Sequence, residues 1–177
     1  MSKSALKILT TAEQLFNQQS FGTVGVDLIR DASGCSKTTL YTYYQNKQQL
    51  IYAVLAARDA QFQANILSFV GEKKGLEAIL SSIDWHILWF QQDNFKGCLF
   101  IRAVAEAHDP NIMRMAQQHK QQIYALVAMY CTQLNQTQWT EMIYTLLEGL
   151  ISRSLLEGVD MLMIEKLKRQ IQQLLSQ

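Results

Sequence analysis

The sequence predicts an all-α protein of about nine helices without a β-strand. Three observations lead to this prediction. The 177 residues include one proline and eight glycines, whereas β-rich domains need these residues at frequent turns. Hydrophobic residues make up 49% of the chain, which is enough for a packed core and excludes a disordered chain. Along most of the sequence these residues recur at intervals of three and four, the period of an amphipathic helix.

Three short helices are expected at the N-terminal end. The first ends near residues 20–22, and its apolar stripe consists of Ile8, Ala12, Leu15 and Phe16. The second, from about Val26, is closed by Gly34, because glycine suits the left-handed conformation that follows a helix end. Ser36 is a suitable N-cap for the third helix, which is expected over 37–43.

Six further helices are expected after these three. Asn46 with Gln49 three residues later is typical of a capping box, and it begins a long helix that Gly71 ends. Asp109 and Pro110 mark another start, with aspartate as the N-cap and proline at the first helical position. Thr137 and Asp160 are suitable caps for the last two. The expected ranges are 47–69, 76–90, 98–107, 110–135, 138–157 and 160–176.

The two short helices joined at Gly34 predict a helix-turn-helix, which assigns residues 1–46 to a DNA-binding domain and 47–177 to a helical domain. A recognition helix presents small and polar groups to the major groove from its N-terminal end. Threonine hydroxyls can bond phosphates or base edges, lysines neutralise phosphates, and a tyrosine hydroxyl can reach a phosphate. The residues of these types in and beside the third helix are Lys37, Thr38, Thr39, Tyr41, Thr42, Tyr43 and Lys47.

Net charge permits DNA binding but does not establish it. The chain carries +1 in total, with +2 in the first fifty residues and −1 in the remainder. The alternative interpretation of the same region is a three-helix cap in which the tyrosines pack into the core. Leu40 and Tyr44 are expected in the core under either interpretation.

Several segments of the N-terminal region keep a characteristic spacing. They are Ile8-Leu9-Thr-Thr-Ala12-Glu-Gln-Leu15-Phe16, Ser20-Phe21, Val26-Asp-Leu-Ile29 and Gly34-Cys-Ser36-Lys37-Thr-Thr39-Leu40-Tyr41-Thr-Tyr43-Tyr44-Gln-Asn46-Lys47. This pattern covers about residues 6–55 and resembles the tetracycline-repressor-like (TetR) family of bacterial regulators. The resemblance implies an all-helical homodimer. Its N-terminal domains would bind a palindromic operator in double-stranded DNA through the seven residues named above, and its C-terminal domain would dimerise and hold a small-molecule inducer.

The sequence departs from the family pattern just before the second helix. Val24 and Gly25 stand where the family usually has a threonine, which caps this helix and touches a phosphate, followed by a small or hydroxyl residue. Thr23 lies one position away and is the expected substitute, so it joins the DNA-facing residues. Arg30 replaces a usual alanine and would supply a compensating charge if it faces outward.

The last two helices are amphipathic and occupy the place where this family dimerises. Two such helices from each subunit would form a four-helix bundle. The alternative is a hairpin packed within one subunit. The residues expected at the dimer interface are Trp139, Ile143, Leu147, Leu150, Met163, Leu167, Ile171 and Leu174.

The middle of the chain is rich in aromatic, methionine and polar residues, as expected for a ligand pocket. The candidate lining residues are Phe62, Trp85, Trp89, Arg102, Tyr124 and Met142. Each of these residues could instead belong to the core, and Arg102 with Glu106 could form an i,i+4 salt bridge.

The sequence offers no support for catalysis, a metal site or a cofactor. It contains no H-x-x-x-H, C-x-x-C, G-x-S-x-G, P-loop or G-x-G-x-x-G motif. No apolar run is long enough for a membrane span, so a cytoplasmic protein without membrane contact is expected. The predicted function is a ligand-responsive transcriptional regulator, with a repressor preferred over an activator. The alternative is a helical small-molecule-binding or enzymatic protein with a vestigial helix-turn-helix.

Overall fold

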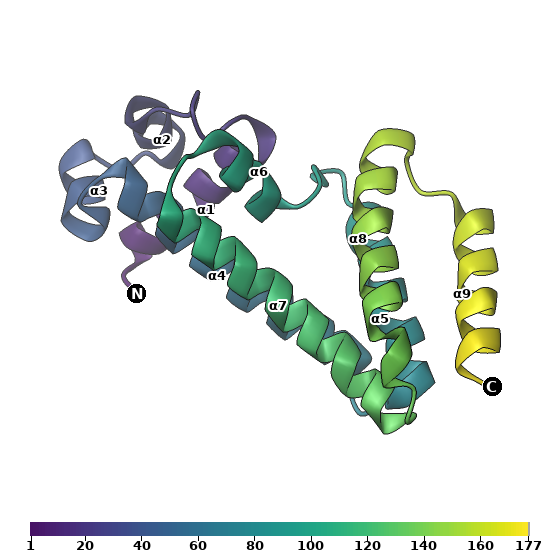
Figure 1. Cartoon of the computed structure of the whole chain (residues 1–177). Coiled ribbons are helices and arrows are strands. Elements are labelled where there is room, and N and C mark those ends of the chain that lie inside the picture. The colour runs from purple at the N-terminus through teal and green to yellow at the C-terminus, as the bar shows by residue number, and fades with distance from the viewer. Residues whose placement is uncertain (177) are drawn as a thin grey trace. The chain divides into compact units, whose positions relative to one another are not determined.

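A computed structural model describes residues 1–176, and this part of the chain folds into nine α-helices with no strand, as predicted (Figure 1). A short 3-10 turn lies before the eighth helix. The helices are α1 (Lys3–Gln18), α2 (Val26–Ser33), α3 (Lys37–Tyr44), α4 (Lys47–Val70), α5 (Gly75–Phe90), α6 (Leu99–Glu106), α7 (Pro110–Gln133), α8 (Thr140–Glu157) and α9 (Met161–Leu175).

Several helix boundaries coincide with predicted caps. The Ser36 hydroxyl accepts a hydrogen bond from the Thr39 amide at 3.0 Å, and the Asn46 side chain accepts one from the Gln49 amide at 2.8 Å. Such bonds satisfy backbone donors that have no partner inside the first turn. Gly34 ends α2 in the left-handed conformation, with φ of 63°.

The start of α8 differs from the prediction. Thr137 does not cap a helix but begins the 3-10 turn Thr137–Trp139, and α8 starts only at Thr140. Trp139 occupies the N-cap position of α8 and makes no side-chain capping bond. Thr137 therefore lies close to the start of α8, but the chain makes a 3-10 turn before the α-helix begins. Such turns are common at helix ends.

The described residues form two compact units. The first comprises residues 1–62 and 98–116, and the second comprises 63–97 and the described residues from 117 onward. The helices α4 and α7 therefore each contribute their N-terminal part to the first unit and their C-terminal part to the second. The first unit contains the three predicted helix-turn-helix helices together with α6.

The core of the first unit joins α1 to α4 with α6 and the start of α7. Phe16 is fully buried, and its ring stacks on that of Phe21 with a centroid distance of 4.8 Å. Leu40 and Tyr44 are buried as predicted, and the Tyr44 hydroxyl donates to the Ala5 carbonyl at 2.7 Å. The other fully or nearly buried members include Ile8, Ala12, Val24, Ile29, Leu50, Val54, Leu55, Phe100, Ala103 and Ile112. These contacts fix α3 on the surface of α1.

The second unit packs α5 with α8 and α9 and includes two partly buried ion pairs and a buried histidine. Lys168 on α9 forms an ion pair with Asp84 on α5 at 2.7 Å. Lys120 on α7 forms a second ion pair with Glu148 on α8 at 2.5 Å. His86 lies in the interior among the rings of α5, and its Nδ1 is 2.7 Å from the Ser82 carbonyl. Burial lowers the pKa of His86 to about 4, and the nearby cationic side chain of Lys120 acts in the same direction.

Acidification is expected to destabilise the chain through His86. In the unfolded chain this imidazole takes up a proton near its ordinary pKa of 6.5, whereas the folded protein resists protonation until about pH 4. The unfolded state therefore binds more protons in this window. The free energy of unfolding should fall by up to about 3 kcal/mol as the pH drops from about 6.5 to about 4.

Denaturant unfolding at several pH values checks this expectation. In a His86→Phe variant the part of the pH slope due to this imidazole should disappear, and the same replacement at the exposed His108 serves as the control. Equal slopes in the original chain and the His86→Phe variant would contradict the assignment.

No helix among residues 1–176 combines the length and the apolar character that crossing a membrane requires. Within the same residues, no group of three or more histidine, cysteine or acidic side chains is placed to hold a metal ion. The cysteines are free thiols. Cys131 is buried, whereas Cys35 and Cys98 are partly exposed.

Candidate nucleic-acid interface

The helix α3 turns one polar face to solvent and one apolar face to the core. Leu40 and Tyr44 form the buried side, while Tyr41 and Tyr43 are each 45% exposed. Between the two tyrosines, Thr42 is also exposed, and five of the seven residues predicted on and beside this helix share the exposed surface: Lys37, Thr38, Tyr41, Thr42 and Tyr43. The exposed parts of these two aromatic rings are accessible to a ligand.

Two threonine hydroxyls on α3 have bonding partners within the helix. The Thr42 hydroxyl donates to the Thr38 carbonyl at 2.8 Å. The hydroxyl of Thr39, which is half-buried, lies 2.8 Å from the hydroxyl of the Ser36 cap. A bond from either of these hydroxyls to a phosphate must replace or share the present one.

The α1–α2 turn shows what the unusual Val24-Gly25 pair does. Val24 is completely buried and belongs to the core of the first unit. Gly25 takes the N-cap position of α2 without a side-chain hydrogen bond. Thr23 does not take over this capping role, because its hydroxyl is bonded to the Ser20 side chain at 2.9 Å. Thr23 remains exposed, so its predicted contact with DNA stays open.

Lys47, at the first position of α4, is half-buried and reaches back to the same turn. Its Nζ lies 3.4 Å from the Gly22 carbonyl, to which it donates. The Gly22 amide in turn donates to the Glu106 carboxylate at 3.2 Å. Partial burial lowers the pKa of Lys47, and the negative charge of Glu106 opposes this shift. Lys47 thus fastens α4 to the α1–α2 turn.

The charges on α2 and α3 form a chain of ion pairs. Lys37 Nζ lies 2.8 Å from a carboxylate oxygen of Asp27, and the same oxygen is 2.5 Å from the guanidinium of Arg30. Arg30 also pairs with Asp31 at 2.7 Å. The Lys37 ammonium is the largest cause that lowers the pKa of Asp27. Arg30 does face outward, with 39% of its side chain exposed, but its charge is shared between two carboxylates.

Two side chains of the first unit make long-range contacts that the sequence does not reveal. Arg102 on α6 donates to the carbonyls of Asn17 at 2.8 Å and Phe16 at 3.2 Å, and also to that of Gln19. These carbonyls close the end of α1, where a cation is favourable. Arg102 was predicted to line a ligand pocket, and the structure places its guanidinium at this helix end.

Asp109 is the second such group. Sequence reasoning identified it as the N-cap of α7, and its carboxylate does accept the Asn111 amide at 2.7 Å. It also accepts hydrogen bonds from the Tyr52 hydroxyl at 2.5 Å and the Gln48 side chain at 2.7 Å. The bond from Tyr52 is the main cause that lowers the pKa of Asp109. One carboxylate thus caps α7 and ties it to the first two turns of α4.

The other predicted pocket residues lie in different surroundings. Phe62 is buried and belongs to the first unit. In the second unit, Trp85 stacks on Trp89 at a centroid distance of 6.2 Å, and Trp89 is buried. Tyr124 packs edge-on against Tyr144 at 5.4 Å, and Met142 is exposed on α8. The assignment of these side chains to one ligand pocket stays a prediction.

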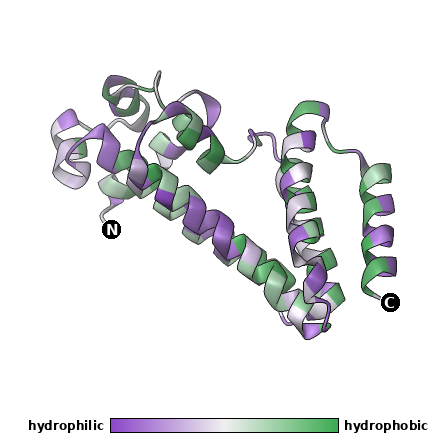
Figure 2. Cartoon of the chain, viewed as in Figure 1, coloured by the Kyte–Doolittle hydropathy of each residue, from purple (hydrophilic) through white to green (hydrophobic). Residues whose placement is uncertain are grey.

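The predicted dimer residues divide by burial. Ile143, Leu147, Leu150 and Ile171 are buried within the protomer, whereas Trp139, Met163, Leu167 and Leu174 are partly exposed. Hydrophobic and hydrophilic bands alternate along α8 and α9 (Figure 2).

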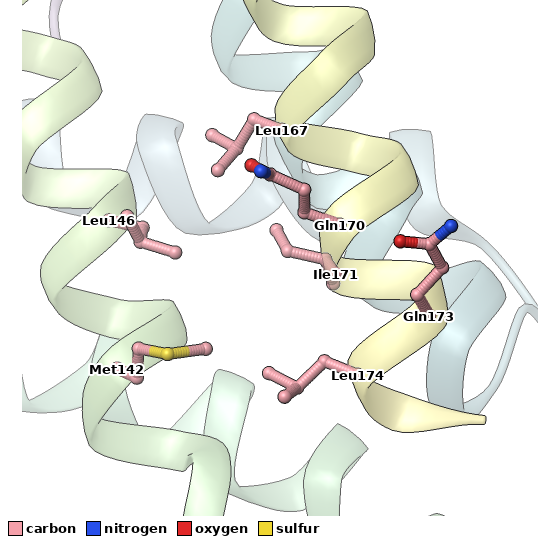
Figure 3. Close-up of a pocket in the computed structure, with 7 residues that line it drawn as sticks. All are labelled: Met142, Leu146, Leu167, Gln170, Ile171, Gln173 and Leu174. Atoms are coloured by element: carbon pink, nitrogen blue, oxygen red, sulfur yellow. The ribbon is translucent and has the colours of Figure 1, made fainter. Parts of the chain in front are cut away.

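Between α8 and α9 lies an apolar groove of about 420 Å³. From α8, Met142 and Leu146 point toward Leu167, Ile171 and Leu174 of α9 (Figure 3). A second groove of about 400 Å³ adjoins it and is lined in part by Trp139, Met142 and Leu146. The role of these residues in dimerisation stays a prediction.

Comparison with known proteins places the N-terminal region in a family. A family model described as "Bacterial regulatory proteins, tetR family" matches residues 8–54. The uncharacterized HTH-type transcriptional regulator MT1294 of Mycobacterium tuberculosis is 40% identical over 47 residues, which cover 27% of this chain. The match spans 23% of that relative, or about a quarter of its length.

Solved structures resemble the chain over nearly its full length. SCO4454, a TetR-family transcriptional regulator from Streptomyces coelicolor, has a TM-score of 0.87 and 22% identity, covering 98% of this chain and 94% of its own. FadR from Bacillus subtilis, solved in complex with stearoyl-CoA, has a TM-score of 0.74 and 15% identity, covering 96% of each chain. These likenesses show a shared all-helical fold. Over residues 8–54 the chain matches the model of the tetR family of bacterial regulatory proteins, and over nearly its full length it shares the fold of solved regulators of that family.

Proposed function

We propose that the chain is a transcriptional regulator that binds double-stranded DNA through α3. The exposed face of this helix carries the proposal. It presents a lysine, hydroxyl groups and two half-exposed tyrosines, while its other face is anchored in the core of the first unit. Lysine and hydroxyl groups position a protein on phosphates, and polar groups at the start of a helix can reach base edges in the major groove.

Selection from random duplex DNA tests the proposal. A palindromic sequence should be enriched over successive rounds, because a symmetric pair of α3 helices reads two half-sites. Lack of enrichment at low salt would favour the alternative, a helical small-molecule-binding or enzymatic protein whose helix-turn-helix is vestigial.

Replacing Tyr43 with alanine is expected to weaken binding to the selected DNA about tenfold, the value of one good hydrogen bond to phosphate. The melting temperature should hardly change, because the side chain lies on the surface. A Tyr43→Phe variant keeps the ring and separates the contribution of the hydroxyl. Fluorescence anisotropy measures the affinities. Unchanged affinity in both variants would refute the assigned contact.

We propose further that two copies associate through α8 and α9. A single recognition helix reads only a few base pairs, whereas two of them about 34–36 Å apart read a palindrome. The apolar groove that contains Met142 and Leu146 supports this association (Figure 3). Exposed apolar side chains elsewhere on these two helices also support it: Leu155, Leu156, Met161 and Leu162.

Gly149 gives a second argument for the dimer. It lies inside α8, and a methyl group added to it would meet no atom within 4 Å in the protomer apart from neighbouring parts of its own helix. A glycine in a helix interior costs about 1 kcal/mol relative to alanine. No contact inside the protomer therefore requires a glycine at this position. A second helix that crosses α8 closely here would require one.

The proposed regulator is a ligand-responsive repressor. An effector bound by the second unit can release the chain from DNA only if it binds the DNA-competent and the released conformations with different affinity. Aromatic side chains such as Trp85 and Trp89 support an effector with a large apolar part. Since Bacillus subtilis FadR was solved with stearoyl-CoA, acyl-CoA compounds form the first class to test for release from the selected DNA.

A further inference from the structure

The surface that carries the DNA-facing lysine also carries its own counter-charges. Lys37 is the first residue of α3 and Asp27 lies in the first turn of α2, with 2.8 Å between ammonium and carboxylate. Asp27, Arg30 and Asp31 continue the network, so two cations meet two anions. Every side chain in the network is between 39% and 65% exposed, which makes all four accessible from solvent.

Fold stability gives little reason for the pair between Lys37 and Asp27. Ion pairs between exposed side chains contribute little to folding, because water and salt screen them. The pair matters more for an anion that approaches from solvent. A phosphate oxygen that binds the Lys37 ammonium must either displace the Asp27 carboxylate or lie beside it, and two anions close together repel each other.

We propose that Asp27 restrains Lys37 and thereby limits the affinity of this surface for the DNA backbone. The inference rests on the proposed DNA binding. Phosphate contacts are the same for every sequence, so a weakened phosphate contact lowers non-specific binding and leaves base contacts on α3 intact. Asp27 is then a specificity-determining residue: it raises the ratio of operator affinity to affinity for other DNA.

The test compares the full-length chain with its Asp27→Asn and Asp31→Asn variants. Asp31 is the matched control, because it has the same charge and a similar exposure and also pairs with Arg30, whereas the close ion pair of Lys37, at 2.8 Å, is with Asp27. The probe is a fluorescent duplex of mixed sequence with a length of about two helical turns. Affinities are measured by fluorescence anisotropy at salt concentrations from about 0.1 to about 0.3 M, and the Debye length is about 10 Å at the lower concentration.

When Lys37 is freed from Asp27 and binds a phosphate, about one more counterion leaves the DNA. The Asp27→Asn variant should therefore bind roughly eightfold more tightly at about 0.1 M salt and roughly threefold more tightly at about 0.3 M. The slope of log affinity against log salt should become steeper by about one. The Asp31→Asn variant should stay within about twofold of the original chain. In a Lys37→Met background, Asp27→Asn should leave the salt slope unchanged.

The conservative Asp27→Glu variant should restore the original affinity, since it keeps the carboxylate within reach of Lys37. Equal or weaker binding by Asp27→Asn would overturn the proposal, because Asp27 would then be neutral or would orient Lys37 for the phosphate. An equal gain in Asp31→Asn, or a steeper slope without Lys37, would also overturn it by showing a general effect of charge. Failure of the original chain to bind any duplex at low salt is a separate result that refutes the proposed function itself.

Discussion

Replacing Arg102 with alanine is expected to lower the free energy of unfolding by about 2–3 kcal/mol. The guanidinium donates to the carbonyls of Phe16, Asn17 and Gln19, which have no further turn of helix to bond with. Hydrogen bonds from a charged donor are worth more than neutral ones, and their loss leaves the carbonyls at the end of α1 unsatisfied. For a chain of this size, each kcal/mol corresponds to about 2–4 °C in Tm.

A matched arginine shows whether the loss comes from this contact. Arg153 on α8 forms an exposed i,i+4 pair with Glu157 at 2.8 Å, so Arg153→Ala should change the free energy of unfolding by less than about 0.5 kcal/mol. Arg102→Lys keeps the positive charge at the end of α1 but loses the forked donor geometry. Its loss in the free energy of unfolding should therefore lie between those of Arg102→Ala and Arg153→Ala. Denaturant unfolding gives all three values. An Arg102→Ala variant as stable as Arg153→Ala would refute the capping role.

Helix ends were predictable because their signals are local. Ser36 and Asn46 each accept a bond from the amide three residues later, so the cap and the helix that it begins lie in one short stretch of sequence. Gly34 likewise takes a backbone conformation that favours its own residue type. The late start of α8 was not predicted, because a threonine such as Thr137 can begin a 3-10 turn as well as cap an α-helix.

The contacts that hold α6 and α7 to the N-terminal helices were not predictable from one sequence. Arg102 and Glu106 are four residues apart, a spacing that suggested a local salt bridge or a place in a pocket. In the structure both bind backbone more than eighty positions away, Arg102 at the end of α1 and Glu106 at Gly22. Asp109 was identified as a cap, but its bond to Tyr52 depends on the packing of α4 beside the α6–α7 turn. No periodicity encodes such pairings.

Periodicity also does not separate an apolar stripe that packs inside a protomer from one that faces a partner. Ile143 and Leu147 repeat at helical spacing and are buried within the second unit. Met142 and Leu146 repeat at the same spacing one position earlier and line the groove between α8 and α9. Successive residues on a helix point about 100° apart, so a shift of one position changes the face. Met142 and Leu146, which line the groove, are therefore the residues to alter in testing the proposed dimer.

A Gly149→Leu variant is expected to dissociate the proposed dimer. Adding a bulky side chain to a close helix crossing costs about 1–3 kcal/mol, and a symmetric crossing suffers it twice, so the dimer should weaken by about a hundredfold or more. The folded protomer should persist, because Gly149 opens onto empty space there and leucine favours a helix. Analytical ultracentrifugation gives the dissociation constant, and circular dichroism confirms the fold. Ala64→Leu adds bulk to an exposed position of α4 as the control.

The smaller Gly149→Ala change distinguishes a crossing point from an empty surface. If nothing approaches this position in the assembled protein, alanine should only stabilise α8, by about 1 kcal/mol, and leave association unchanged. If a second helix crosses here, the methyl group should weaken association while the protomer still gains helix stability, so folding and association move in opposite directions. A destabilised fold cannot produce this pair of results. A dimer that tolerates both alanine and leucine at this position would place the interface away from Gly149 and refute the crossing.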